Sequence, residues 1–186
     1  TATNLTGDLT GMSVGVEIAL SNTALQPTKD VTITVAYQDS EVTAASLDES
    51  KLVLARFDAA RSVWVPLVST VDTTANTVRA KTNHFSTFQI MQASPSGSVA
   101  NAKVFPNPFL PAKGHTSITF SNLPASVAIK IYTLTGGLAS ELTTNASGLA
   151  SWDGKNMSGE DTASGVYFAY IEGTGGKKTL KVAIQR

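Results

Sequence analysis

The sequence lacks cysteine altogether and has only two histidines. The absence of cysteine excludes disulfides, thiolate zinc sites and thiol nucleophiles. Two imidazoles, His84 and His115, are too few for a histidine-rich metal centre, and we expect no bound metal or cofactor. Charge is also scarce, at 15% of residues, and fourteen basic side chains balance fourteen acidic ones. Because no net field would hold the chain against phosphates, we expect no nucleic-acid partner.

Long hydrophobic runs are missing as well. None approaches the roughly 20 apolar residues that a membrane-spanning helix requires, so we expect no membrane span. No basic and apolar secretion signal opens the chain. It begins at Thr1 rather than Met, and we interpret it as part of a longer polypeptide with further domains upstream.

Threonine and serine are abundant, at 24 and 19 of the 186 residues. A chain rich in these residues and poor in charge is typical of bacterial surface and secreted modules. Apolar residues alternate with polar ones in short runs, as in half-buried strands. The best helical candidate is the short segment 41–50. The clearest alternating runs are Val31, Ile33 and Val35, then Ile129 and Ile131, and Leu180, Val182 and Ile184.

A stretch of small, polar and turn-forming residues lies between the two halves of the chain. It runs over residues 92–102 and includes Pro95 and Gly97, a composition typical of linkers. We therefore expect two domains, 1–95 and 96–186. Short strands separated by turn signals predict an all-β fold, with two tandem antiparallel β-sandwich, Ig-like domains.

Four spaced motifs stand in the second half. They read Val104-Phe-Pro-Asn-Pro-Phe109, Ile118-Thr-Phe-Ser-Asn-Leu-Pro124, Trp152-Asp-Gly154 and Ala163-Ser-Gly-Val-Tyr-Phe168. Over residues 99–186 this order resembles the Ig-like module of flagellar hook-capping proteins and the type IX secretion C-terminal sorting domain. The resemblance implies a secreted or cell-surface protein of a Gram-negative-type bacterium. Its partner would be the outer-membrane sorting machinery.

The last predicted strand is basic and has no acidic residue. The sorting resemblance makes its basic side chains the candidate contacts with the secretion machinery: Lys177, Lys178, Lys181 and Arg186. A solvated face on an ordinary edge strand is the simpler interpretation. Hook-capping modules share the folding motifs without sorting, so the motifs leave both interpretations open.

The first half resembles, over residues 12–91, bacterial domains similar to the ZU5 domain. Its runs include Val31-Thr-Ile-Thr-Val-Ala-Tyr37 and Asn83-His-Phe-Ser-Thr-Phe88. Some members of that family cleave themselves between the Phe and Ser of such a motif. By that analogy the Ser86 hydroxyl would attack the Phe85 carbonyl while His84 accepts its proton. The alternative is that Phe85 and Phe88 anchor a core, and that the first half is a non-catalytic spacer.

A further alternative is a carbohydrate-binding or adhesion module, which would present a row of exposed aromatic residues. The candidates are Trp64, Tyr132, Trp152, Tyr167 and Tyr170, although alternation places several of them inward. Two smaller expectations concern the loops: Gly165 suggests a positive φ or a close backbone approach, and His115 suggests a solvated side chain.

Overall fold

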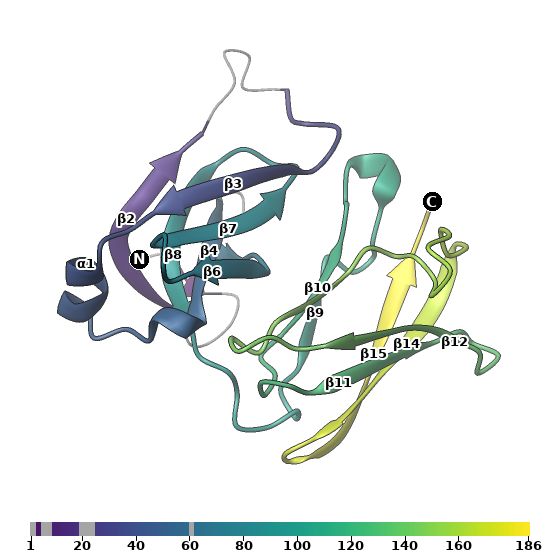
Figure 1. Cartoon of the computed structure of the whole chain (residues 1–186). Helices are drawn as coiled ribbons and strands as arrows, with labels where there is room; N and C mark the ends of the chain where they lie inside the picture. Colours follow the sequence, from purple (N-terminus) through teal and green to yellow (C-terminus); the bar gives the residue numbers. More distant parts are fainter. Residues whose placement is uncertain (1–2, 5–8, 19–24, 60–61) are drawn as a thin grey trace. The chain divides into compact units, whose positions relative to one another are not determined.

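A computed structural model describes residues 3–4, 9–18, 25–59 and 62–186. The chain divides into two compact units, Thr1–Ser94 and Pro95–Arg186. Each unit has its own buried core and its own pair of sheets (Figure 1).

The first unit is built from two sheets. The larger has five strands in the order β1 (Thr3–Asn4), β5 (Val63–Pro66), β4 (Leu52–Asp58), β8 (Thr87–Ala93) and β2 (Leu9–Glu17). The smaller has the order β3 (Val31–Ala36), β7 (Thr77–Thr82) and β6 (Ser69–Asp72). All these strands pair antiparallel except β1 with β5. Both sheets contribute to one core, which includes Leu54, Phe88 and Ile33.

The second unit also has two sheets, both antiparallel. One has the order β13 (Ala150–Trp152), β10 (Ile118–Ser121) and β9 (Lys103–Phe105). The other has the order β12 (Leu138–Thr143), β11 (Ala128–Tyr132), β14 (Gly165–Gly173) and β15 (Gly176–Ile184). Trp152, Phe120 and Ile131 are buried between them in one core, and a 3-10 turn, η2 (Pro111–Lys113), follows β9.

The structure confirms the predicted all-β fold class, because two packed sheets form each unit. The expected helix is shorter than segment 41–50: α1 covers Asp39–Ala44, and a separate 3-10 turn, η1, covers Glu49–Lys51. Ser46 divides them because its φ is +54°, which a continuous helix does not allow. Among the described residues, no helix is long and apolar enough to cross a membrane.

The expectation for Gly165 is wrong. It is the first residue of β14 and pairs with Ile184. Its φ is not positive, and a Cβ built on it would meet no atom within 4 Å. A side chain could therefore replace this hydrogen without strain.

Candidate functional site

The β14–β15 hairpin contains three of the four basic residues predicted to contact the secretion machinery, Lys177, Lys178 and Lys181. Its register runs from Gly165 opposite Ile184 to Gly173 opposite Gly176. Gly175 and Gly176 have φ values of +85° and +108° and form the turn. Because β15 pairs with β14 alone among strands, it is an edge strand of its sheet (yellow in Figure 1).

Alternation along β15 separates the basic residues that the sequence analysis grouped. Lys178 lies on the face of β15 that contains Leu180 and the buried Val182, whereas Lys177 and Lys181 lie on the opposite, outer face. Because successive residues of a strand point to opposite faces, the positions of these lysines in the sequence already indicate this separation. The candidate contact residues therefore do not form one continuous face.

Lys177 stands in a small polar cluster on the outer face. Its Nζ lies 3.3 Å from Glu172 Oε1 and 6.0 Å from the centre of the Tyr170 ring, and the Tyr170 hydroxyl donates to Glu172 Oε2 at 2.8 Å. Tyr170 and Glu172 raise the pKa of Lys177, and Tyr170 and Lys177 lower the pKa of Glu172. Since this cluster is exposed to solvent, it contributes little to stability and its members can exchange partners.

Arg186 makes several contacts with the loop that follows β13. Its Nε donates to the Thr162 carbonyl at 2.6 Å and its Nη2 to the Gly154 carbonyl at 2.8 Å. Nη2 also lies 3.2 Å from Asp161 Oδ1, and the backbone nitrogen donates to Ser164 Oγ at 2.9 Å. The guanidinium is thus engaged within its own unit, unlike Lys181, for which the described residues provide no ion pair.

The segment after β9 covers one part of the β15 edge. Asn107 Nδ2 donates to the Lys181 carbonyl, and the Ala183 nitrogen donates to Asn107 Oδ1, at 2.8 and 2.9 Å. Phe109 continues this pairing: its nitrogen donates to the Ala183 carbonyl, and its carbonyl accepts from the Gln185 nitrogen. The edge is therefore closed from Lys181 onwards towards the end of the chain.

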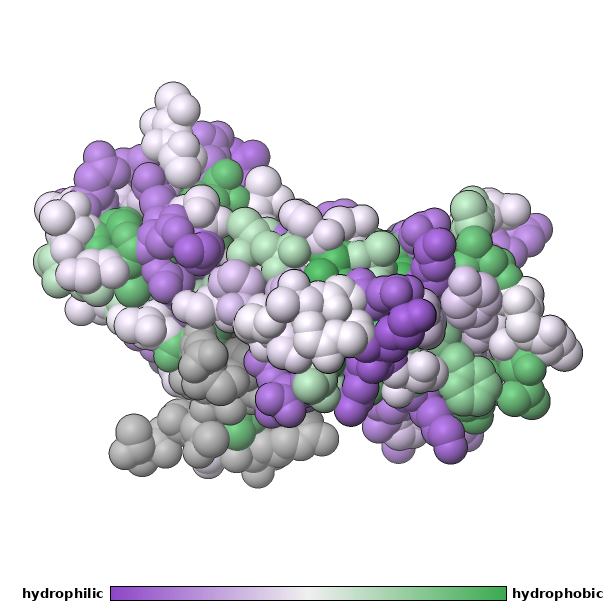
Figure 2. Space-filling view, turned by 90° about the horizontal axis from the view of Figure 1, so that it is seen from below, coloured by the Kyte–Doolittle hydropathy of each residue, from purple (hydrophilic) through white to green (hydrophobic). Residues whose placement is uncertain are grey.

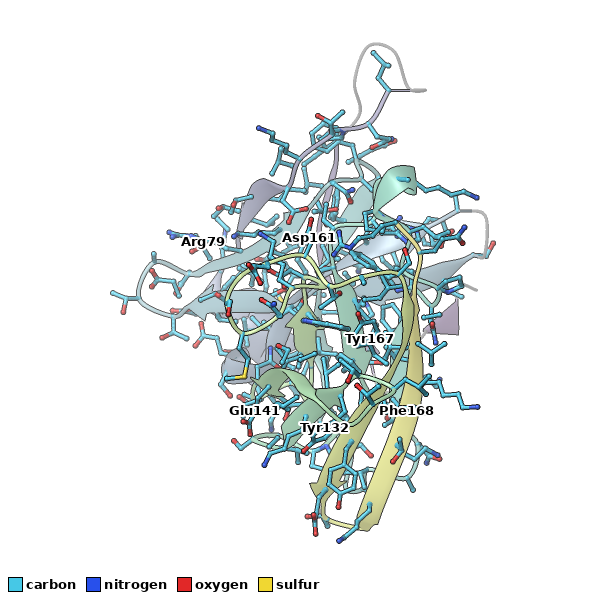
Figure 3. All side chains as sticks on the ribbon, turned by 90° about the vertical axis from the view of Figure 1, so that its right-hand side faces the viewer. Arg79, Tyr132, Glu141, Asp161, Tyr167 and Phe168 are labelled. Atoms are coloured by element: carbon cyan, nitrogen blue, oxygen red, sulfur yellow. The ribbon has the colours of Figure 1, made fainter. Side chains whose placement is uncertain are left out.

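Most aromatic residues of the second unit lie either in the core or on the outer face of the β12–β11–β14–β15 sheet. Trp152 and Tyr167 are buried, with 1% and 7% of their surface exposed, and their rings are 5.6 Å apart. Tyr132 and Phe168 are opposite each other across β11 and β14 (Figure 3). Tyr170, two positions after Phe168, lies on the same face by the alternation along β14. Phe168 was not among the aromatic residues that the sequence suggested for carbohydrate binding, although it alternates with Tyr170.

The three residues of the possible self-cleavage motif lie in the first unit, between β7 and β8. The Ser86 hydroxyl donates to the Phe57 carbonyl at 2.7 Å, rather than to His84. Burial, followed by the charge of Arg56, lowers the pKa of His84, so its imidazole is neutral near pH 7. Phe85 is bonded through its backbone to the side chain of Gln26.

The described part of the chain contains no group of three or more His, Cys, Asp or Glu side chains that could hold a metal ion. The polar loop after β13 uses its oxygens internally: Asn156 Oδ1 accepts from the nitrogens of Ser158 and Glu160, and Asp153 Oδ1 accepts from the Lys155 nitrogen. His115 is only partly solvated: it is half-buried, and its Nδ1 accepts a hydrogen bond from the Leu110 nitrogen at 2.9 Å.

The face seen in Figure 2 shows no large patch of only hydrophobic or only hydrophilic residues among the described part of the chain. Hydrophilic and hydrophobic residues are interspersed over it. The large apolar side chains with the greatest exposure belong to different elements: Leu25, Leu134 and Met157 lie in loops, Leu138 in β12 and Val166 in β14.

Comparison with known proteins gives a match for the second unit. Residues 103–185 match the family model of the secretion system C-terminal sorting domain, and no curated protein matches the chain significantly. Among solved structures, one similar chain is PorZ of Porphyromonas gingivalis, described as an essential bacterial surface component of the type-IX secretion system. The identity is 23% and the TM-score 0.44, over 53% of this chain and 14% of PorZ.

A second similar structure is dimeric latent PorU from Porphyromonas gingivalis, at 19% identity and a TM-score of 0.31, over 73% of this chain and 16% of PorU. The chain thus spans only a small part of either protein. The family match confirms the resemblance predicted for the second half, while the ZU5-like resemblance of the first half stays a prediction. Over residues 103–185, this chain contains a domain that matches the secretion system C-terminal sorting family.

Proposed function

We propose that Pro95–Arg186 is a type IX sorting domain, which directs the polypeptide through the outer membrane to the cell surface or the medium. The observation on which this depends is the family match over residues 103–185. A delivery role requires a stable surface that a receptor can recognise. It requires no catalytic residue.

The three lysines of β15 are the proposed contacts with the secretion machinery. Lys177 and Lys181 project from the outer face of the edge strand, and Lys178, which is half-buried, lies on the opposite face. Arg186 has a different role in this proposal: it fixes the end of the chain against the Gly154 and Thr162 carbonyls. The lysines would bind, and the arginine would hold the bound surface in shape.

We further propose that the first unit, Thr1–Ser94, is a non-catalytic spacer between this domain and other parts of the polypeptide. It has its own core, and Ser86, the only hydroxyl of the proposed cleavage motif, donates to the Phe57 carbonyl. A rigid sandwich of this kind separates its neighbours along the chain without acting on them.

A reporter fusion tests the sorting proposal. The full chain is fused after an exported fluorescent protein in a bacterium with a type IX system, and a fusion ending at Ser94 is compared. We expect surface display from the full chain only. Replacing the three lysines by Gln should lower display, whereas Lys130→Gln, an exposed lysine on the same sheet, should not. Equal display by both fusions would refute the proposal.

A further inference from the structure

The hydrogen-bonding groups of β15 are not satisfied along its whole length. The backbone groups of Ala183 point away from β14, since they bond to Asn107 and Phe109 on the other side. Successive residues of a strand direct these groups to opposite sides. Lys177 and Thr179 therefore direct their N–H and C=O groups to the open edge as well, as does the Lys181 N–H.

The open part of this edge is short and has defined limits. Asn107 accepts from Ala183 and donates to the Lys181 carbonyl, which closes the edge at one end. The turn at Gly175 and Gly176 closes it at the other. Between these limits, no described residue of the chain bonds to the outward backbone groups of Lys177 or Thr179. An unpaired strand edge of this kind is a template for another extended chain.

The side chains around the open edge determine which extended chain fits. Lys177 and Lys181 flank Thr179 on the outer face. Directly opposite residues on neighbouring strands have their side chains in contact, and opposite charges stabilise such pairs while like charges oppose them. A second copy of β15 laid antiparallel about Thr179 would place Lys177 opposite Lys181. The lysines therefore disfavour self-pairing and favour an acidic strand.

The other face of the open edge has a different preference. Leu180 is half-buried and packs against the core of the second unit, and Lys178 precedes it by two positions. A residue opposite Leu180 would extend this apolar surface. The fitting strand thus alternates acidic residues on one face with apolar residues on the other.

We propose that the open edge, Lys177–Lys181, binds an extended acidic segment of a partner protein by adding it as a fifth strand to the β12–β11–β14–β15 sheet. A peptide with the core Glu-Val-Thr-Val-Glu has the required pattern in either direction. This inference stands on the geometry of the edge and not on the proposed sorting function. A failure of peptide binding would leave the reporter experiment unaffected.

The test is titration of the full, isotope-labelled chain with this peptide, followed by amide chemical shifts. We expect the largest shifts at Lys177, Thr179 and Lys181, and weaker binding, by at least about tenfold, when Lys replaces Glu in the peptide. Two N-methylated peptides, each methylated on one set of alternate nitrogens, separate strand pairing from simple charge attraction. The peptide methylated on the nitrogens that face β15 should not bind, because these nitrogens can no longer donate hydrogen bonds. The peptide methylated on the other nitrogens should bind as before.

Variants of the chain complete the test. Thr179→Pro removes an outward N–H while leaving the ladder to β14 intact, and it should abolish binding, whereas Thr179→Ala should not. The double variant Lys177→Glu, Lys181→Glu leaves the backbone unchanged and should prefer the lysine peptide. The proposal is overturned if no peptide binds, if both methylated peptides bind equally well, or if the charge reversal leaves the preference unchanged.

Discussion

The guanidinium of Arg186 donates a hydrogen bond to the backbone carbonyl of Gly154, 32 positions earlier in the chain, at 2.8 Å. Thr162, at the other end of the same loop, places its carbonyl 2.6 Å from Nε and its hydroxyl 2.7 Å from the Gly154 carbonyl. One side chain thus joins both ends of the loop that connects β13 to β14. This contact links the final residue to the stability of the second unit.

We predict that Arg186→Ala destabilises the second unit by about 1–2 kcal/mol, because two carbonyls lose a charged donor. Arg186→Lys should recover part of the loss, since an ammonium lacks the planar fork that serves both carbonyls. The measurement is urea unfolding followed by the fluorescence of Trp152, in a Trp64→Phe background that leaves one tryptophan.

The matched control is Asp161→Asn, which removes the exposed ion pair with Arg186 and leaves the carbonyl contacts. Its effect should stay within about 0.5 kcal/mol. If Asp161→Asn cost as much as Arg186→Ala, the ion pair and not the bridge between carbonyls would be the stabilising contact.

Gly148 is the backbone position of the second unit least able to accept a side chain. Its φ is +70°, and a Cβ would lie 2.0 Å from the Leu123 carbonyl oxygen. We predict that Gly148→Ala costs more than about 3 kcal/mol, since backbone strain and a clash with main chain act together. The midpoint of urea unfolding measures this loss.

Gly159→Ala provides the comparison. Gly159 has nearly the same φ, +79°, but no atom lies within 4 Å of its added Cβ. Gly159→Ala should lower the free energy of unfolding only by the cost of a left-handed backbone conformation at alanine, about 1–2 kcal/mol. Equal losses for the two variants would contradict the role assigned to the Leu123 contact.

The sequence was sufficient to predict the strands in which buried and exposed residues alternate. Alternation in Ile129 and Ile131 places both in the core, as observed. The same alternation places Lys178 and Lys177 on opposite faces of β15. Grouping the lysines by charge alone missed this difference. Local spacing is enough here because β11 and β15 each have one buried face.

Contacts between distant segments could not be predicted in the same way. No local pattern shows that Asn107 covers the edge of β15 at Ala183, or that Arg186 reaches Gly154, because each contact depends on how two sheets close. The contact of His115 was missed for a different reason: its partner, Leu110, is close in the sequence but immediately precedes a 3-10 turn, η2, that the sequence did not indicate.

We predict that the chain does not cleave itself between Phe85 and Ser86. The Ser86 hydroxyl donates to the Phe57 carbonyl at 2.7 Å, so its proton is directed away from His84. Denaturing mass spectrometry of freshly prepared protein should show one intact mass, and Ser86→Ala should only reduce stability, by about 1 kcal/mol. Two fragments meeting at this bond, absent in Ser86→Ala, would establish the cleavage instead.

The last prediction concerns the pH dependence of the second unit. Burial, followed by the charge of Lys113, lowers the pKa of His115 below its ordinary value of 6.5. Its Nδ1 must be unprotonated to accept from the Leu110 nitrogen. The unfolded chain therefore binds the proton more readily than the folded one, and stability rises with pH in this range.

The contribution of His115 is fully present above pH 6.5 and is lost as the pH falls from 6.5 through the lower folded-state pKa. We expect a lower urea midpoint near pH 5.5 than near pH 7.5, read from Trp152. Glu172 does not account for the change, since its pKa is already lowered from 4.5. His115→Gln keeps an acceptor but has no proton to gain, so its midpoint should vary less with pH, and an unchanged pH dependence would exclude His115 as the titrating group.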